Sequence, residues 1–253
     1  MGTSRTIRTI QTVRTIVALL FVVSGDAFAQ RGQGPAGPPP TARADAAVDL
    51  TGTWVSVVTE DWVLRMLPPR KGDLRNIPLT PAAQKVAAAW DPAKDEAAGE
   101  PCKAYGAPAV TRIPGRMRIS WQDESTLKVE MEAGNQTRLL HFQPAPPPAQ
   151  PTWQGLSIAQ WEYTRVPPST GNLKVVTNHL RPGYLRKNGV PYSANATVTE
   201  YFHRQTAPNG DEWILLISEV TDPENLRQPW VQSSHFKKLP AGAPFTPEPC
   251  SAR

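Results

Sequence analysis

Three short runs of alternating apolar and polar residues, separated by tight turns, constrain the fold of this chain more than any other feature of its sequence. They occupy residues 116–122, 126–132 and 136–142. In the middle run, leucine, valine and methionine alternate with lysine and glutamate. Because successive side chains of a strand point to opposite faces, such a run buries one face and exposes the other. The Asp-Glu-Ser and Ala-Gly-Asn segments between the runs supply turns, so the pattern predicts an antiparallel meander.

Six further segments are also typical of strands. They are residues 50–61, 156–165, 173–180, 196–205, 212–221 and 230–236. The proline-rich residues 144–151 cannot lie within a sheet, and residues 184–192 are expected to form a loop. One short helix is predicted: Thr80 is its N-cap, Pro81 stands at its first position, residues 82–90 supply good helix formers, and Asp91-Pro92 stops it.

This order of elements predicts an all-β fold. Antiparallel neighbours joined by short turns close into an up-and-down, lipocalin-like barrel or a strongly curled sheet. An immunoglobulin-like sandwich is the second choice, because hairpin connections dominate and no Cys–Trp–Cys spacing occurs. Residues 48–253 have a length that suits one such domain.

The first 29 residues have the order of a secretory signal peptide. Three arginines precede an apolar run at 16–23, and Ala27 and Ala29 place small residues where an export peptidase cuts, before Gln30. The run is far shorter than the roughly 20 apolar residues that cross a bilayer. The sequence therefore predicts a periplasmic or secreted protein that is not inserted in the membrane after cleavage.

Residues 30–47 consist mainly of glycine, proline, alanine and arginine, without a large apolar side chain, and are predicted to form a disordered linker. Three basic residues and one acidic residue leave with the signal peptide, which lowers the formal net charge from +5 to +3. This even balance argues against nucleic acid as a partner. The basic residues are scattered, and Arg65 in particular is expected at an ordinary solvated position.

The two cysteines, Cys102 and Cys250, both lie in the mature chain. In an oxidising compartment a disulfide is their natural use, and it would tie the C-terminal tail to the segment after the helix. The alternative is a two-thiolate metal site, but no histidine stands at ligand spacing beside either cysteine. We therefore predict a disulfide.

Two local patterns carry a resemblance to known families. Gly52-Thr53-Trp54 resembles the G-x-W of lipocalin-like barrels, in which the tryptophan plugs one end of the barrel. The segment 151–162 reads P-T-W-x-G-x-S-x-x-x-W-E, and it resembles a family of exported bacterial β proteins of uncharacterised function.

Other parts of the chain extend the second resemblance. They are the Leu-Thr-Pro at 79–81, the cysteine-containing loop at 102–108, and the segments 173–177, 199–203 and 222–230. The chain departs from the pattern at Thr177, where the family has an acidic residue. The resemblance implies a shared fold and export, and no particular reaction.

Several motifs that would carry chemistry are missing from the sequence. The four histidines form none of the short metal-binding spacings, so no metal site is predicted. There is no G-x-S-x-G elbow for a nucleophilic serine. Without a phosphate-binding glycine loop or a dinucleotide fingerprint, no cofactor is predicted.

The densest group of polar and aromatic residues follows the strand at 173–180. Asn178, His179, Arg181 and Tyr184 lie where a strand enters a loop, and loops held on a rigid scaffold often carry function. We predict that Asn178 and Arg181 contact a ligand. His179 and Tyr184 are candidate acid or oxyanion partners.

Two strand glutamates are candidate general bases: Glu162, beside Trp161, and Glu200, beside Tyr201. A glutamate that points inward would be a desolvated carboxylate suited to proton transfer. The alternative is a cross-strand pair with arginine or lysine on the wet face, and alternation alone does not decide between them. Trp161 and Tyr201 are predicted ligand contacts.

Three hypotheses for function follow from these observations. The leading one is an exported β-barrel that binds a small, partly apolar ligand in its mouth. The second is a hydrolase or lyase that uses Glu162 or Glu200 as general base, with His179 and Tyr184 as partners. The third is an envelope module that binds other proteins through sheet edges. The sequence does not indicate an oligomeric state.

Overall fold

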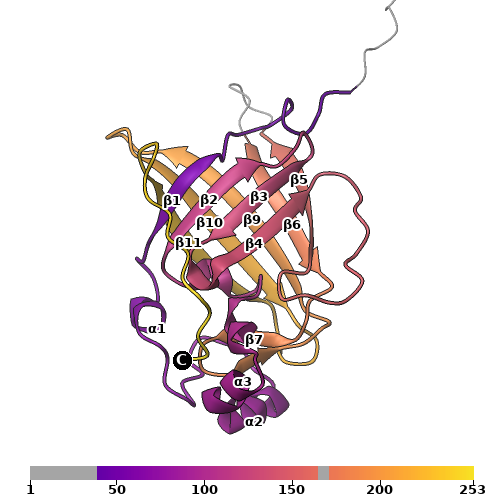
Figure 1. Ribbon diagram of the computed structural model, residues 1–253, viewed down its shortest axis with the longest axis vertical. Coiled ribbons are helices and arrows are strands. Elements are labelled where there is room, and N and C mark those ends of the chain that lie inside the picture. Colours follow the sequence, from indigo (N-terminus) through magenta and orange to yellow (C-terminus); the bar gives the residue numbers. More distant parts are fainter. Residues whose placement is uncertain (1–38, 165–170) are drawn as a thin grey trace, which may run out of the picture. The chain divides into compact units, whose positions relative to one another are not determined.

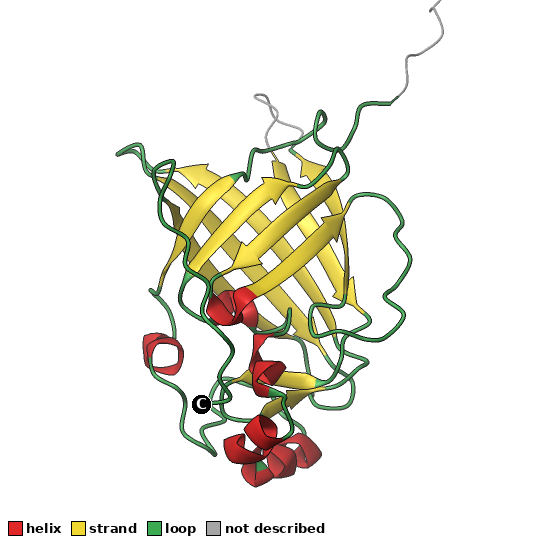
Figure 2. Ribbon diagram, viewed as in Figure 1, coloured by secondary structure: helices red, strands yellow, loops and turns green. Residues whose placement is uncertain are grey.

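Nine strands form a closed barrel in the computed structural model, which describes residues 39–164 and 171–253 (Figures 1 and 2). In chain order they are β1 (Gly52–Val57), β2 (Arg116–Trp121), β3 (Thr126–Met131), β4 (Gln136–His141), β5 (Leu156–Tyr163), β6 (Gly171–Asn178), β9 (Thr197–Thr206), β10 (Glu212–Thr221) and β11 (Trp230–Lys238). Each of the nine predicted strands is present. The prediction of an all-β barrel is confirmed.

The barrel closes through β1, which pairs with β11 on one side and with β2 on the other. Trp54 lies opposite Lys238 of β11 and opposite Met117 of β2. Closure gives every strand of the ring two neighbours and leaves no free edge in the ring. It also divides each strand into side chains that point into the barrel and side chains that point away from it.

One pair of neighbours is parallel: β4 and β5, with Leu140 opposite Ser157. The other pairs of the ring are antiparallel, so the barrel is mixed rather than fully antiparallel as the meander predicts. A parallel neighbour requires a connection that returns the chain to the end where the first strand began. The proline-rich residues between β4 and β5 make this return and lie outside the sheet, as predicted.

A second, two-stranded sheet lies in the segment that was predicted to be a loop. It consists of β7 (Gly183–Arg186) and β8 (Val190–Tyr192). The Asn188-Gly189 turn joins them, and Gly189 has a φ of +80°. Asn-Gly is a hairpin signal, but strands of four and three residues are too short to show alternation in the sequence.

The part of the chain that the structure describes has three short α-helices instead of the one predicted. The predicted helix is α2 (Pro81–Ala89), and the Thr80 side chain accepts a hydrogen bond from the backbone of Ala83 (3.2 Å). The Asp91-Pro92 pair, predicted as its stop, also begins α3 (Pro92–Ala97), because the Asp91 carboxylate caps the new helix as Thr80 caps α2. A five-residue helix, α1 (Trp62–Met66), follows β1.

All three α-helices and β7 lie beyond one end of the barrel, which we call the helical end (Figure 1). Three 3₁₀ turns complete the set: η1 (Pro101–Tyr105), η2 (Val110–Arg112) and η3 (Ala133–Asn135). No helix in residues 39–164 and 171–253 is long and apolar enough to cross a bilayer.

Apolar side chains fill the barrel. Trp54, Met117, Phe202 and Phe236 are each no more than 1 % exposed and belong to one cluster, which we call the barrel core. A second cluster, the end core, lies at the helical end and includes Tyr192 and Trp230 among its members. Trp54 donates its indole N–H to the carbonyl of Leu50 (3.0 Å), so the tryptophan of the G-x-W motif is a core residue.

The predicted signal peptide and residues 30–38 of the predicted linker lie outside the described residues. Within the rest of that linker, Thr41 and Arg43 contact the carboxylate of Glu124 (2.9 and 3.3 Å). The carbonyl of Ala42 accepts a hydrogen bond from the indole N–H of Trp161 (2.8 Å). These contacts hold the segment on the end of the barrel opposite the helical end.

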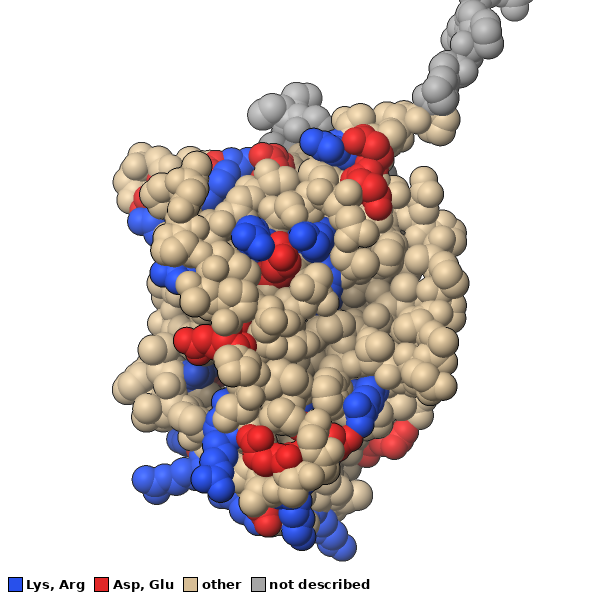
Figure 3. Space-filling model, viewed as in Figure 1, with Lys and Arg blue, Asp and Glu red and all other residues tan. Residues whose placement is uncertain are grey.

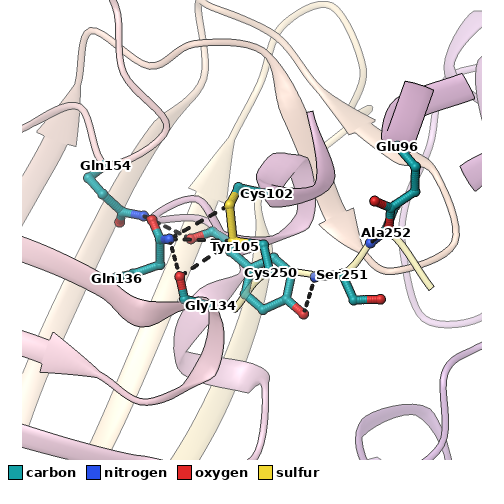
Figure 4. Close-up of a disulfide and its surroundings, with 9 residues drawn as sticks. All are labelled: Glu96, Cys102, Tyr105, Gly134, Gln136, Gln154, Cys250, Ser251 and Ala252. Carbon is teal, nitrogen blue, oxygen red and sulfur yellow. Dashed lines mark hydrogen bonds between the residues drawn. A yellow bond between two sulfur atoms is a disulfide. The ribbon is translucent and has the colours of Figure 1, made fainter. Parts of the chain in front are cut away.

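The predicted disulfide between Cys102 and Cys250 is present and joins η1 to the C-terminal tail (Figure 4). Beside it, Gly134 has a φ of +70°, and a Cβ there would lie 2.4 Å from the ring of Tyr105. The Tyr105 hydroxyl accepts a hydrogen bond from the backbone of Ser251 (3.3 Å). The tail is thus fixed to the helical end by a covalent bond and by a backbone contact.

Removal of the disulfide is expected to destabilise the domain strongly. The bond spans 148 residues, and closing a loop of that size stabilises by up to ~5 kcal/mol in the chain-entropy model. Replacement of both Cys102 and Cys250 by serine should therefore lower the urea midpoint by an amount within that limit. Addition of a reductant should lower the midpoint of the wild-type protein and leave that of the double variant unchanged. An equal midpoint for both proteins would contradict this account.

Candidate functional site

Glu200 points into the barrel, is fully buried, and is paired. Its carboxylate accepts two hydrogen bonds from the guanidinium group of Arg138, at 3.0 and 2.5 Å. Arg138 also donates to the hydroxyl of Thr177 (3.2 Å). Both oxygens of Glu200 are thus engaged by a buried cation rather than free to accept a proton from a substrate.

The pair belongs to a group of inward-facing polar residues on β4, β5, β6, β9, β10 and β11, here called the polar belt. Its members are Arg138, Ser157, Thr177, Glu200, Ser218 and Gln232, all at most 9 % exposed. The belt separates the two apolar clusters, since along β9 Val198 belongs to the end core and Phe202 to the barrel core, with Glu200 between them. It is therefore an internal layer, remote from solvent.

The other candidate base, Glu162, lies on the outer face of the barrel. Its carboxylate is 3.9 Å from the ammonium group of Lys174 on the neighbouring strand. The same ammonium group lies over the ring of Tyr201, 5.6 Å from its centroid. Glu162 and Lys174 thus form the cross-strand pair on the wet face that was the alternative to the catalytic hypothesis, and Tyr201 lies on the same outer face.

Trp161 points inward, at the end of the barrel opposite the helical end. Its ring packs against those of Trp121 (6.4 Å between centroids) and Phe142 (5.1 Å). All three pack against the barrel core, and the hydrogen bond to Ala42 covers the indole. Trp161 therefore belongs to an aromatic plug.

The polar loop after β6 faces the surface of the helical end. His179 is exposed with a φ of +54°, and its Nδ1 lies 2.6 Å from the side-chain oxygen of Asn178. The guanidinium group of Arg181 stacks on the ring of Trp153 (4.6 Å) and forms an ion pair with Glu100. None of these contacts reaches the barrel interior.

Tyr184 lies on β7 in a separate network. Its hydroxyl donates to the carboxylate of Asp95 (3.3 Å), which also accepts hydrogen bonds from the indole of Trp90 (3.0 Å) and the ammonium group of Lys103 (2.8 Å). Burial and the charge of Asp95 raise the pKa of Tyr184 to about 12. Tyr184 therefore remains protonated at neutral pH.

The four candidate catalytic residues do not share one cavity. Glu200 lies inside the barrel, Glu162 on its outer wall, His179 on an exposed loop and Tyr184 against α3 and η1. The enzyme hypothesis requires them to converge on a substrate, and this arrangement does not support that role for the group.

A cavity of about 170 Å³ lies elsewhere, at the helical end and outside the barrel ring. Its walls come from α1 and the residues after it, from η1 and η2, and from β7. Most of the lining is apolar and includes Leu64, Leu67, Ala104, Ala109, Ile113 and Leu185. Three arginines, Arg65, Arg112 and Arg186, complete it.

The helix α1 covers this cavity because of its own local sequence. Asp61 begins the helix in a left-handed conformation (φ 49°), and its carbonyl accepts hydrogen bonds from the backbone of Leu64 and Arg65. Pro68 and Pro69 prevent the helix from continuing. Within this single turn, Arg65 faces inward, whereas Trp62 is 61 % exposed.

Arg65 and Arg112 anchor α1 to the barrel end. Arg65 donates to the carbonyl of Arg112 (3.0 Å) and forms an ion pair with Glu60. Arg112 forms an ion pair with Asp61 (2.9 Å) and donates to the carbonyl of Ser233 on β11 (3.1 Å). Burial lowers the pKa of both arginines, that of Arg65 to about 10.

Arg186 has a different environment. It donates to the carbonyl of Arg75 (2.7 Å), and its guanidinium group lies 5.5 Å from the ring centroid of Trp230. Among the described residues no carboxylate forms an ion pair with it. Burial and the charge of Arg112 lower its pKa to about 10, against the opposing charges of Asp61 and Asp73.

Sequence reasoning missed this site. The prediction that Arg65 is an ordinary solvated residue is wrong, because it is only 8 % exposed. One signal was present: Arg65 stands alone in the run Trp-Val-Leu-Arg-Met-Leu, and a single arginine among apolar residues is a candidate for burial. Arg138 could likewise have been found, since alternation places it on the same face as Leu140 and Phe142.

Basic and acidic side chains are interspersed on the face of the molecule shown in Figure 3. On β2 and β3, Arg118 and Lys128 both contact the carboxylate of Glu130 (3.0 and 3.3 Å). This face therefore has no extended basic surface of the kind that binds a phosphate backbone.

Comparison of the chain with protein families, with curated proteins and with solved structures finds no match. The two resemblances drawn from the sequence therefore stay predictions. Within residues 39–164 and 171–253, no three side chains of histidine, cysteine, aspartate and glutamate are grouped so that they could hold a metal ion.

Removal of the charge of Glu200 is expected to destabilise the fold. The Glu200→Gln variant leaves the guanidinium group of Arg138 buried and without its counter-ion, which typically costs about 3 to 5 kcal/mol. Unfolding in urea, followed by tryptophan fluorescence, measures this loss. The control is Glu162→Gln on the outer face, where an exposed ion pair contributes only ~0 to 1 kcal/mol.

A second variant separates pairing from burial. Replacement of both Arg138 and Glu200 by methionine removes both charges, and it should recover much of the stability lost by Glu200→Gln. If Glu200→Gln and Glu162→Gln lose equally little stability, the buried pair does not stabilise the barrel as expected.

Proposed function

We propose that this protein is an exported binding protein for a small, partly apolar molecule, and that the molecule binds in the cavity beneath α1. The cavity itself carries the proposal, because it combines apolar walls with a few buried polar groups, as ligand sites do. The ligand is still the small, partly apolar molecule that the sequence predicts, but we place its site in this cavity instead of in the barrel mouth. The barrel mouth is occupied by Trp121, Phe142 and Trp161, whereas the cavity lies at the other end.

The size of the cavity limits the ligand. Its volume of about 170 Å³ compares with the ~150 Å³ of an engineered apolar cavity that binds benzene. Sites for drug-sized molecules are larger, with volumes of roughly 300 to 1,000 Å³. A single ring or a short aliphatic chain therefore fits, and a larger ligand would have to displace α1.

The helix α1 is suited to cover such a ligand. Trp62 and Val63, which do not line the cavity, are exposed by 61 % and 42 %, so the outer side of α1 is apolar and has few contacts with the rest of the chain. The inner side is held chiefly by the ion pairs of Arg65 and of Asp61. A segment with few apolar contacts opens at low energetic cost, which gives a ligand a route to the cavity.

The proposal of export draws support from the disulfide. A bond between Cys102 and Cys250 persists in oxidising compartments, such as the periplasm or the medium outside the cell. The predicted signal peptide points to the same compartments. The enzyme hypothesis and the envelope-module hypothesis stay predictions, with no contact in the described residues that favours either of them over binding.

A variant that fills the cavity tests the proposal. Ala109 is 2 % exposed and lines the cavity, so Ala109→Leu should occupy it and abolish binding. Saturation-transfer NMR with a library of monocyclic aromatic and short-chain compounds should detect ligands of the wild-type protein that the variant no longer binds. Ala88→Leu, on the exposed face of α2, is the matched control and should bind as the wild type does.

A second variant keeps the test decisive if Ala109→Leu fails to fold, since overpacking a core can lower the free energy of unfolding by ~1 to 3 kcal/mol. Leu64→Ala enlarges the cavity from the side of α1, and it should extend binding to larger members of the same library. Binding that none of these substitutions alters, or a library without a single ligand, would contradict the proposed function.

A further inference from the structure

The geometry points to an organic anion as the ligand, specifically a small monocarboxylate whose apolar part occupies the cavity. This inference rests on the proposed function and deepens it. The apolar walls admit many small molecules, whereas the three arginines distinguish among them by charge.

The charges at the cavity do not balance. Arg65 is paired with Glu60 and Arg112 with Asp61, but Arg186 has no carboxylate partner among the described residues. All three arginines are more than nine-tenths buried. A buried cation is ordinarily paired, because its loss of hydration is otherwise uncompensated. The site therefore contains one guanidinium charge that a ligand can neutralise.

Hydrogen-bond donors are also left over. One terminal nitrogen of Arg65 and one of Arg186 are buried without an acceptor in the part of the chain that the structure describes. Such unsatisfied donors are rare in native proteins. Both side chains line the cavity, and a planar guanidinium group matches the two oxygens of a carboxylate, so a carboxylate ligand suits Arg65 and Arg186.

The positive charges of the arginines also repel one another. Arg112 lowers the pKa of Arg65 and of Arg186, in addition to the effect of burial. A bound anion would reduce this repulsion, whereas a cationic ligand would increase it. Lys187, at the edge of the cavity, adds a further positive charge. The electrostatics of the site thus favour an anion and oppose an amine.

The apolar walls and the small volume favour a carboxylate over a phosphate ester. A phosphate carries up to two charges and three terminal oxygens that all require donors, whereas the walls formed by Leu64, Ala109 and Ile113 offer none. A carboxylate places two oxygens against the arginines and leaves the rest of the molecule to the apolar side chains.

A matched series of ligands tests the inference on the unmodified full chain. Benzoate, benzyl alcohol and benzylamine share one ring and differ in the charge of the attached group, and phenyl phosphate supplies a second anion. Chemical-shift titration of the isotope-labelled protein measures each affinity. We expect benzoate to bind at least roughly 10-fold more tightly than benzyl alcohol, as charge-assisted hydrogen bonds imply. We expect phenyl phosphate to bind more weakly than benzoate, and benzylamine not to bind.

Substitution of Arg186 tests which group is responsible. Arg186→Met should weaken benzoate binding by roughly 10- to 100-fold and should change the affinity for benzyl alcohol far less, because the alcohol carries no charge. Arg186→Lys keeps the charge but loses the planar fork, so it should weaken benzoate binding to an intermediate degree. Arg118→Met removes an exposed, ion-paired arginine of the barrel wall and should not change benzoate binding.

The outcomes separate this inference from the proposed function. Benzyl alcohol binding as tightly as benzoate would overturn the anion inference and leave the cavity as a binding site. Tighter binding of phenyl phosphate than of benzoate would overturn the choice of a carboxylate. If none of the four compounds binds, the result counts against the proposed function as well. Because the ligand series uses the unmodified protein, it decides the question even if Arg186→Met fails to fold.

Discussion

Closure of the barrel by β1 determines which side chains this chain must bury and where it has room for a ligand. Since β1 pairs with both β2 and β11, every strand of the ring has an inner and an outer face, and the inner face must be filled. Large side chains such as Trp54 and Phe236 fill it. A polar group that enters this interior needs a partner there, and Glu200 and Arg138 are each other's partner. A filled interior leaves the two ends of the barrel as the places for a ligand.

The two ends differ in how they are closed. At one end an aromatic plug that includes Trp161 packs tightly and is covered by residues 41–45. At the helical end, closure depends on several short elements that no single sheet organises, and the disulfide and the C-terminal tail hold them together (Figure 4). Short elements with irregular connections leave gaps more readily than a continuous sheet does. The cavity lies among such elements, between α1, η2 and β7.

The strands could be predicted because their signal is local. Alternation and turn residues depend on neighbours in sequence, and they locate β3 and β10 almost to the residue. The parallel pairing of β4 and β5 depends on where a proline-rich loop places the chain, which no local pattern contains. The orientations of Glu162 and Glu200 depend on the register of the closed ring, so alternation left both open. The arginine cavity joins residues 65, 112 and 186, and only the tertiary fold brings them together.

The requirement that a buried charge be paired explains why one buried arginine is structural and another is a candidate for binding. Arg138 points into the barrel from β4, and Glu200 on β9, which is not its neighbour in the ring, supplies a carboxylate at 2.5 Å inside the barrel, where the pair is sealed from solvent. Arg186 lies on a two-stranded sheet outside the ring, where its protein partners are a backbone carbonyl and the face of Trp230. Neither partner carries a negative charge, so the electrostatic requirement of a buried cation is met in part only. An anion bound beneath α1 would meet that requirement, and it would link the fold of the helical end to the chemistry proposed for it.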